Sequence, residues 1–427
     1  MKKTRRTSWR EKPIIVVLIV LGIVVFTFIS LFSTSNRIDP QEEIYIADVT
    51  PTPTPEQKPE PKPELTPEPT PEQTPIAQAE EILPPPVETP EPTPDPGIDY
   101  LLEGGQFELP LTGATGYAPV PLRLYAEPGT NAGSIMTLSA GKGFTILSED
   151  AGWWNITADG FEGWVSHRFC FINLPDLLPS IVYNITNAGS SVMRSSGYEI
   201  PNITTHKLYE AKSFNPRLNR EEYVVPVLYS TAKLIFNAQQ AALSDGNTII
   251  MVEAFRPRET QQLIVRNLQS LMNSNSEVRN AINAPPWGIS WFISTSLSNH
   301  QRGAAVDVSL GKIITLEAGK TGNYAYKQIT EYEEYTMPTA MHELGPRAAT
   351  FKNPVSSTSR TDWKQAAFSD SITDAAKLMQ SYFTNAGFTP LASEWWHFND
   401  LDGRGRASEA GITGDFIIGI VHSVEPY

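Results

Sequence analysis

Cysteine is nearly absent from the sequence, and positive charge is scarcer than negative charge. Cys170 is the single cysteine, which excludes an intramolecular disulfide and a zinc site built from thiolates. The 33 lysines and arginines face 47 aspartates and glutamates, and the net charge of −14 argues against binding to nucleic-acid phosphates. At roughly 100–200 residues per domain, a chain of 427 residues has room for two or three folded units.

Charged side chains are also absent from residues 14–32. This apolar run is long enough to cross about 30 Å of hydrocarbon as a helix. Residues 1–12 carry six basic side chains and one acidic one, so the positive-inside rule predicts a cytoplasmic N-terminus and extracellular C-terminal domains. A cleaved signal peptide is the alternative, although its apolar core usually spans only about 7–15 residues. We therefore expect residues 1–38 to form a cytoplasmic tail and a single-pass membrane anchor.

The next segment, residues 39–98, is rich in proline, glutamate and threonine. Residues 51–98 hold 17 of the 36 prolines, together with ten acidic side chains and two lysines. Proline favours extended polyproline II, which at roughly 3.1 Å per residue spans on the order of 100 Å here. Such a segment is either a spacer or a ligand for SH3 or WW domains, and for an extracellular segment we expect a spacer.

Residues 99–175 contain short runs of alternating apolar and polar residues separated by glycine turns, a pattern typical of a small β-barrel. The module resembles a bacterial SH3 domain in its LRLYAEPGTNAGSIMTL segment, the following Gly-Trp-Trp strand and a closing Gly-Trp-Val. Members of that family commonly bind peptidoglycan or its peptides, so the resemblance implies cell-wall targeting. Neighbouring residues of one strand point to opposite faces, so we expect Trp153 or Trp154 to be exposed and to contact the ligand. The alternative is a spacer barrel whose tryptophans only fill a core.

Residues 176–427 are long enough for one sizeable core. Ser371 and Asp374 resemble a capping box at the start of a helix. We expect helices at residues 222–243 and 258–273 and a third that starts at this capping box and ends before Gly387, and strands at residues 247–255, 305–310 and 388–398. Helices and strands without βαβ regularity predict an α+β fold around a mostly antiparallel sheet.

Two of the six histidines lie in unusual surroundings, SNHQRGAAVD and SEWWHFN. His300, Asp307 and His397 together would supply two imidazoles and one carboxylate, which suits a catalytic zinc with one open position. Glu394 would then be an acid/base candidate. By this chemistry alone, a solvated or core histidine is the competing interpretation. Glu394 and His397 are three apart, so a bend or bulge is needed if this segment is a strand.

A resemblance supports the zinc interpretation. Ser298 to Asp307 matches S-x-H-x-x-G-x-A-x-D at every defined position, and Glu394-Trp395-Trp396-His397 follows far downstream. Both motifs are similar to those of the M15 family of zinc D-Ala-D-Ala peptidases, which includes dipeptidases and D,D-carboxypeptidases. Phe255-Arg256-Pro257 resembles the Tyr-Arg-Pro element of the family, and Met337-Pro338-Thr339 resembles a further dipeptidase loop. The likeness covers roughly residues 220–400.

The resemblance implies a role for each matched residue. His300, Asp307 and His397 would bind Zn²⁺, and Glu394 would move protons. Arg256 would stabilise the tetrahedral intermediate, although a substrate-carboxylate clamp or a structural ion pair are alternatives, and Ser298 would contact substrate.

Two further arginines and the other four histidines receive no catalytic or metal-binding role. Arg258 and Arg302 are expected to be solvated. The other four histidines are expected to be structural: His167, His206, His342 and His422.

The expected function follows from these resemblances. The chain would be a zinc metallopeptidase anchored in a bacterial cell membrane, with its C-terminal domains extracellular, that hydrolyses D-Ala-D-Ala-type bonds in peptidoglycan stem peptides. The alternatives are an endopeptidase that cuts within stems or cross-bridges, and a non-catalytic protein that binds the cell wall.

Overall fold

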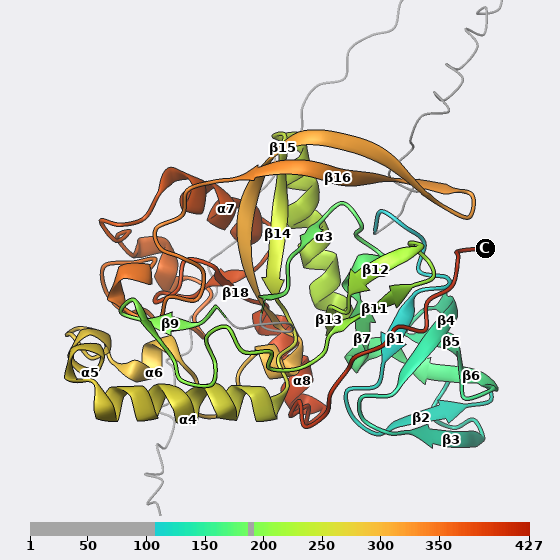
Figure 1. Ribbon diagram of the computed structural model, residues 1–427. Coiled ribbons are helices and arrows are strands. Elements are labelled where there is room, and N and C mark those ends of the chain that lie inside the picture. Colours follow the sequence, from blue (N-terminus) through green and yellow to red (C-terminus); the bar gives the residue numbers. More distant parts are fainter. Residues whose placement is uncertain (1–106, 187–191) are drawn as a thin grey trace, which may run out of the picture. The chain divides into compact units, whose positions relative to one another are not determined.

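The computed structural model describes residues 107–186 and 192–427 (Figure 1). These residues belong to one compact unit with two main β-sheets and several helices. The predicted anchor at residues 14–32 and the predicted linker at residues 39–98 lie outside the described residues. Within the described ranges, no helix has the length and apolar character needed to cross a membrane.

Eight short strands form the first sheet, in the order β13-β7-β1-β4-β5-β6-β2-β3, and all neighbours are antiparallel. Strand β5 alternates half-buried and buried residues, the period of two that the sequence predicted. Asp159 and Gly160 both have positive φ and form the two-residue turn between β5 and β6. The prediction of a small β-rich module is confirmed. The strands are β1 (Thr115–Tyr117), β2 (Leu122–Tyr125), β3 (Ser134–Leu138), β4 (Gly143–Asp150), β5 (Trp153–Ala158), β6 (Phe161–Ser166), β7 (Phe171–Asn173) and β13 (Pro226–Leu228).

Strand β13 joins the β module, defined here as residues 107–175, to the rest of the chain. It lies beyond the predicted boundary at residue 175, yet it pairs with β7 with Val227 opposite Ile172. Tyr229, the first residue of the next helix, places its ring 4.8 Å from the ring of Trp154, centroid to centroid, in an edge contact. The two predicted domains therefore share one sheet and one hydrophobic core.

The second sheet has the order β17-β18-β15-β14-β8, and β16 pairs with β15. Only β8 and β14 run parallel, so the expected mostly antiparallel sheet is observed. Strand β14 is buried on both faces, which explains its nearly continuous run of apolar residues. The strands are β8 (Val182–Tyr183), β14 (Asn247–Glu253), β15 (Ala305–Thr321), β16 (Tyr324–Glu334), β17 (Thr389–Pro390) and β18 (His397–Asn399).

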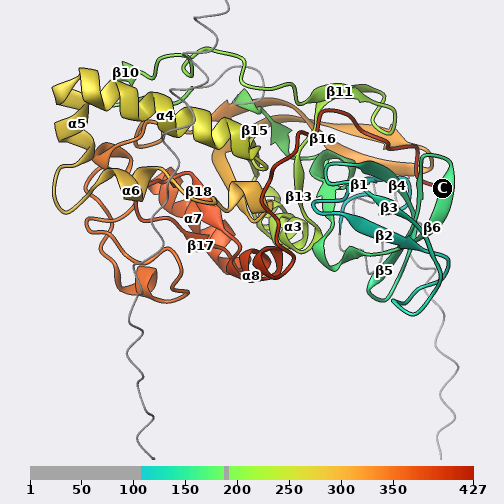
Figure 2. The ribbon, with the colours of Figure 1, turned by 90° about the horizontal axis from the view of Figure 1, so that it is seen from below.

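Helices α3 and α7 pack against each other and against the second sheet, whereas α4 runs along another side of the molecule (Figures 1 and 2). The helices are α3 (Tyr229–Ser244), α4 (Arg258–Ser274), α5 (Ser276–Ile282), α6 (Ile289–Phe292), α7 (Asp374–Asn385) and α8 (Leu401–Glu409). Two small hairpins pair β9 (Arg194–Ser195) with β10 (Tyr198–Glu199) and β11 (Lys212–Asn215) with β12 (Arg220–Tyr223). The 3₁₀ turns are η1 (His167–Phe169), η2 (Leu174–Asp176), η3 (His300–Arg302), η4 (Pro346–Ala348) and η5 (Asp362–Gln365).

Three predicted boundaries are wrong. The helix expected at 222–243 starts only at Tyr229, because the segment around Pro226 is extended and proline at the first position of β13 is tolerated there. Helix α7 is capped by Thr373, whose hydroxyl accepts a hydrogen bond from Ala376 N, and not by Ser371. The strand expected at 388–398 is interrupted by a turn between β17 and β18.

The end of the chain packs back onto the β module. After α8 it crosses the first sheet in both ribbon views (Figures 1 and 2), and Val424 N donates to Gly113 O at 2.8 Å. The hydroxyl of Tyr117 donates to Ile420 O at 2.8 Å. The chain end therefore adds a further set of contacts between the β module and the rest of the structure.

Candidate metal centre

Strand pairing in the second sheet brings acidic and histidine side chains together. Strand β15 lies between β18 and β14. Its residue Asp307 is paired with His397 on β18 and with Glu253 on β14. His300 reaches the same place from η3, which ends at Gly303 in the left-handed region with a φ of 64°. A side chain at Gly303 would also clash with the ring of Phe171, so glycine is required for this turn from η3 into β15.

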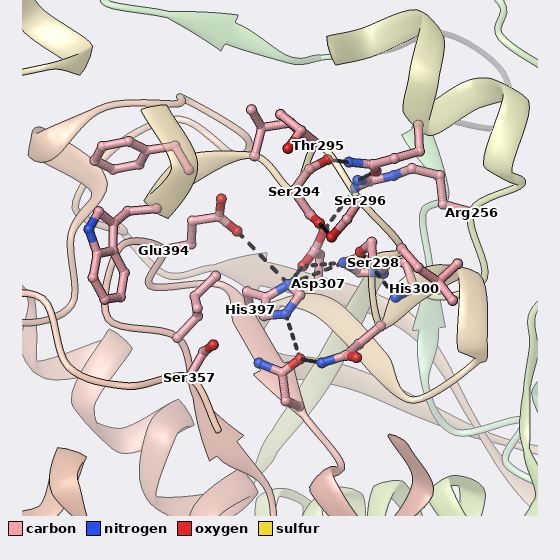
Figure 3. Close-up of a pocket in the computed structure, with 18 of the residues that line it drawn as sticks. Arg256, Ser294, Thr295, Ser296, Ser298, His300, Asp307, Ser357, Glu394 and His397 are labelled. Carbon is pink, nitrogen blue, oxygen red and sulfur yellow. Dashed lines mark hydrogen bonds and ion pairs between the residues drawn. The ribbon is translucent and has the colours of Figure 1, made fainter. Parts of the chain in front are cut away.

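Three ligand atoms form a compact triangle (Figure 3). The distances are 2.8 Å from His397 Nδ1 to Asp307 Oδ1, 3.1 Å from His300 Nε2 to His397 Nδ1, and 3.3 Å from His300 Nε2 to Asp307 Oδ1. A tetrahedral site with bonds of about 2.0–2.1 Å separates its ligand atoms by roughly 3.3 Å. All three side chains are at least nine-tenths buried. The triangle therefore has about the size of one face of a metal coordination shell.

The two imidazoles are oriented by oxygen atoms outside the triangle. His300 Nδ1 donates to Ala254 O at 2.7 Å, and His397 Nε2 donates to Asn399 Oδ1 at 3.0 Å. Each ring therefore carries its proton on the outer nitrogen and directs a lone pair at the common centre. This donor set fits a metal ion.

The second oxygen of Asp307 is held separately. His342 Nε2 donates to Asp307 Oδ2 at 2.9 Å, and Arg256 lies 3.6 Å from the same oxygen. His342, which was expected to be structural, contacts the site itself because its loop folds back onto β15. No local motif marks His342 in the sequence, whereas Glu253 is detectable as an acid at the end of an otherwise apolar strand.

Arg256 already has partners for its charge. Its Nε donates to Glu253 Oε1 at 2.8 Å, a second guanidinium nitrogen binds Glu253 Oε2, and a third donates to Gln261 Oε1 at 2.6 Å. Glu253, Asp307 and His342 form a second group with metal-binding side chains, but this guanidinium supplies the positive charge beside its two carboxylates. Of the roles that the sequence left open for Arg256, the ion pair is the one observed.

Electrostatics favour the ligand forms of Asp307 and His300, whereas burial would lower the pKa of His397 but its hydrogen bond to Asp307 raises it. Burial alone would raise the pKa of Asp307, but His300 holds that pKa well below its usual range. Burial lowers the pKa of His300, which favours the neutral imidazole. An ionised carboxylate and a neutral imidazole are the forms that bind metals.

Glu394 lies beside the triangle and outside it. Its Oε2 is 3.9 Å from His397 Nδ1, and the turn between β17 and β18 puts both side chains on the same side, which resolves the conflict in their spacing. Burial raises the pKa of Glu394 to about 8, against an opposing effect of His397. The neighbouring tryptophans are structural: Trp395 Nε1 donates to Thr339 Oγ1 at 3.0 Å, and Trp396 packs edge-on against His342.

A pocket of about 400 Å³ opens onto this centre. Ser298 lies on its wall, where its hydroxyl accepts from His300 N at 3.3 Å. Figure 3 shows Glu394 on one side of the ligands and the Ser294–Ser298 segment with Arg256 on the other. The polar and charged side chains that line the pocket are Arg256, Gln261, Ser290, Ser294, Thr295, Ser296, Ser298, Asn299, His300, Arg302, Asp307, His342, Ser357, Thr358, Glu394, His397, Asn399 and Arg404.

The comparison with known families identifies the β module. Residues 121–169 match the family model of the bacterial SH3 domain. No curated protein matches the chain. The matched segment covers strands β2 to β6, so the SH3 likeness concerns the β module and leaves the metal centre unassigned.

The SH3-like region corrects one expectation about tryptophan. Trp154 is fully buried against Phe144 and Tyr229, so it is not part of a binding surface. Trp153 points to the other face of β5, is half-buried and makes an edge contact with Tyr125. Of the two predicted contact residues, only Trp153 is accessible to a ligand.

Proposed function

We propose that the chain is a zinc metallopeptidase that hydrolyses D-Ala-D-Ala-type bonds in peptidoglycan stem peptides. The observation that carries the proposal is the buried triangle of His300, Asp307 and His397 at the floor of a pocket, with Glu394 beside it. Two imidazoles and one carboxylate without thiolate suit zinc, and three protein ligands leave one position open. The substrate class rests on the motif resemblance around these residues.

Each side chain has a task in this chemistry. A bound zinc ion would polarise the scissile carbonyl and make a bound water acidic enough to react near neutral pH. Glu394 is outside the ligand triangle yet within a water's reach of it, so its carboxylate is placed to accept a proton from the attacking water and return it to the leaving amine. Glu253 and His342 hold Arg256 and Asp307, which keeps one carboxylate oxygen of Asp307 turned towards the ligand triangle.

Cell-wall localisation is part of the same proposal. Bacterial SH3 domains often bind cell-wall material, and residues 121–169 match that family. The apolar run at residues 14–32 would anchor the chain in the membrane, and the proline-rich segment would carry the folded unit towards the wall. A peptidase placed there meets stem peptides rather than cytoplasmic dipeptides.

The test is hydrolysis of purified muropeptides by the full chain, followed by mass spectrometry of the products. Loss of a terminal D-Ala identifies a carboxypeptidase, whereas cleavage of cross-linked dimers identifies an endopeptidase. Chelation should abolish hydrolysis, zinc should restore it, and His300→Ala should lose both metal and activity. Activity that survives chelation, or a zinc-loaded protein that cleaves no muropeptide, would contradict the proposal.

A further inference from the structure

Two arginines line the pocket without an acidic partner. Arg302 belongs to η3, next to the ligand His300, and Arg404 belongs to α8, which follows β18. Within the described residues, neither guanidinium forms an ion pair with a carboxylate. Both side chains are half-buried, so Arg302, which was expected to be solvated, is only partly so.

The acidic groups around α8 are engaged elsewhere. Asp400 accepts from Thr231 Oγ1 at 2.8 Å and from Gly403 N at 2.7 Å. Asp402 pairs with Arg360, and Glu409 pairs with Arg168. Arg404 is therefore left without a counter-charge on its own helix, although the protein as a whole is strongly acidic.

A chain of hydrogen bonds connects Arg302 to His397 of the metal centre. One of its terminal nitrogens donates to Asn299 Oδ1 at 3.1 Å and to Leu297 O at 3.3 Å. Asn299 Nδ2 then donates to Asn399 Oδ1 at 2.7 Å, and that oxygen also accepts from His397. The Nε of Arg302 is buried and has no hydrogen-bond partner among the described residues. Arg302 is thus fixed at one terminal nitrogen, and its other terminal nitrogen, which has no hydrogen bond among the described residues, is the donor left for a ligand.

The elements that carry the two arginines, η3 and α8, contact each other, and both side chains line the same pocket. Burial lowers the pKa of Arg302, and the positive charge of Arg404 lowers it further. Like charges held together beside a pocket are stabilised by an anion that binds between them. Planar guanidinium groups match the geometry of a carboxylate.

We propose that Arg302 and Arg404 form a subsite that binds a free carboxylate of the substrate. This inference rests on the proposed peptidase function and narrows its substrates to peptides that present a free carboxylate to this subsite. Arg256, the third arginine of the pocket lining, already forms an ion pair with Glu253. Arg302 and Arg404 are therefore the arginines of the lining that have no acidic partner. The carboxylate comes either from the peptide C-terminus or from an acidic residue within the stem.

Binding to a catalytically silent full-length chain tests the subsite. Zinc-loaded Glu394→Gln protein is titrated calorimetrically with a stem peptide that ends in D-Ala-D-Ala, supplied with a free or amidated C-terminus and with a free or amidated internal carboxyl. We expect one acid form to bind about 10- to 100-fold more tightly than its amide. Arg302→Gln and Arg404→Gln should reduce that preference to within about threefold, and Arg302→Lys should retain part of it.

Arg258→Gln is the matched control, because it removes one positive charge from an exposed arginine that pairs with Asp415 and does not line this pocket. Equal binding of acid and amide, or a preference that survives both glutamine substitutions, would overturn the subsite. A preference for the amide would overturn it as well. Hydrolysis by the unmutated chain is measured separately. Hydrolysis without an arginine-dependent preference refutes the subsite alone, whereas that preference without hydrolysis refutes the proposed function alone.

Discussion

Replacing Trp154 with alanine tests whether the β module and the C-terminal part of the chain stabilise each other. The indole is fully buried and contacts rings from both sides: Phe144 and His167 in the β module, and Tyr229 at the start of α3. Removal of a buried tryptophan costs about 3–5 kcal/mol of the free energy of unfolding, because the cavity collapses only in part. Since the cavity would border both parts, we expect both to lose stability.

Hydrogen exchange measured by mass spectrometry separates the two parts. Slowly exchanging amides should exchange at least about 100-fold faster in the Trp154→Ala variant, in strands β4–β6 and also in α3 and β14. Trp153→Ala is the matched control on the same strand, and its half-buried side chain should cost only about 1 kcal/mol. Faster exchange confined to the β module, with α3 unchanged, would refute the shared core.

Two further predictions concern buried polar groups. Replacing His342 with phenylalanine removes the donor to Asp307 Oδ2 and should weaken metal binding about 10- to 100-fold, whereas His342→Gln should restore part of the affinity. The dissociation constant is measured by competition with a chromophoric chelator, and an unchanged value would contradict this positioning role. Burial raises the pKa of Glu108 from 4.5 to about 7. The folded state therefore binds this proton more tightly than the unfolded state does. The contribution of the proton to the free energy of unfolding is lost as pH rises from about 4.5 to about 7. That change amounts to about 3 kcal/mol, and urea unfolding should show it in the unmutated chain but not in Glu108→Gln; identical pH profiles would refute it.

The sequence was informative where chemistry and local pattern coincide. The strand at Asn247–Glu253 and the helix at Arg258–Ser274 follow from apolar periodicity and lie where they were predicted. His300, Asp307 and His397 were identified by their motifs, and the structure brings them together through the pairing of β15 with β18.

What could not be predicted depends on contacts between distant segments. The residues around Pro226 contain no local pattern that predicts β13 or its pairing with β7 in the first sheet. The burial of Trp154, not of Trp153, depends on which face of β5 meets Tyr229. His342 reaches Asp307 through a loop, 35 residues along the chain, so only the folded arrangement shows that it supports a ligand.

The central claim is that Glu394 performs proton transfer beside a metal held by three other residues. The most direct measurement is metal content and muropeptide hydrolysis in Glu394→Gln, compared with Asp307→Ala. We predict that Glu394→Gln keeps about one zinc per chain and loses roughly 10²- to 10⁴-fold in kcat, whereas Asp307→Ala loses the metal itself. A zinc-loaded Glu394→Gln protein with undiminished kcat, or one that has lost its zinc, would contradict the account.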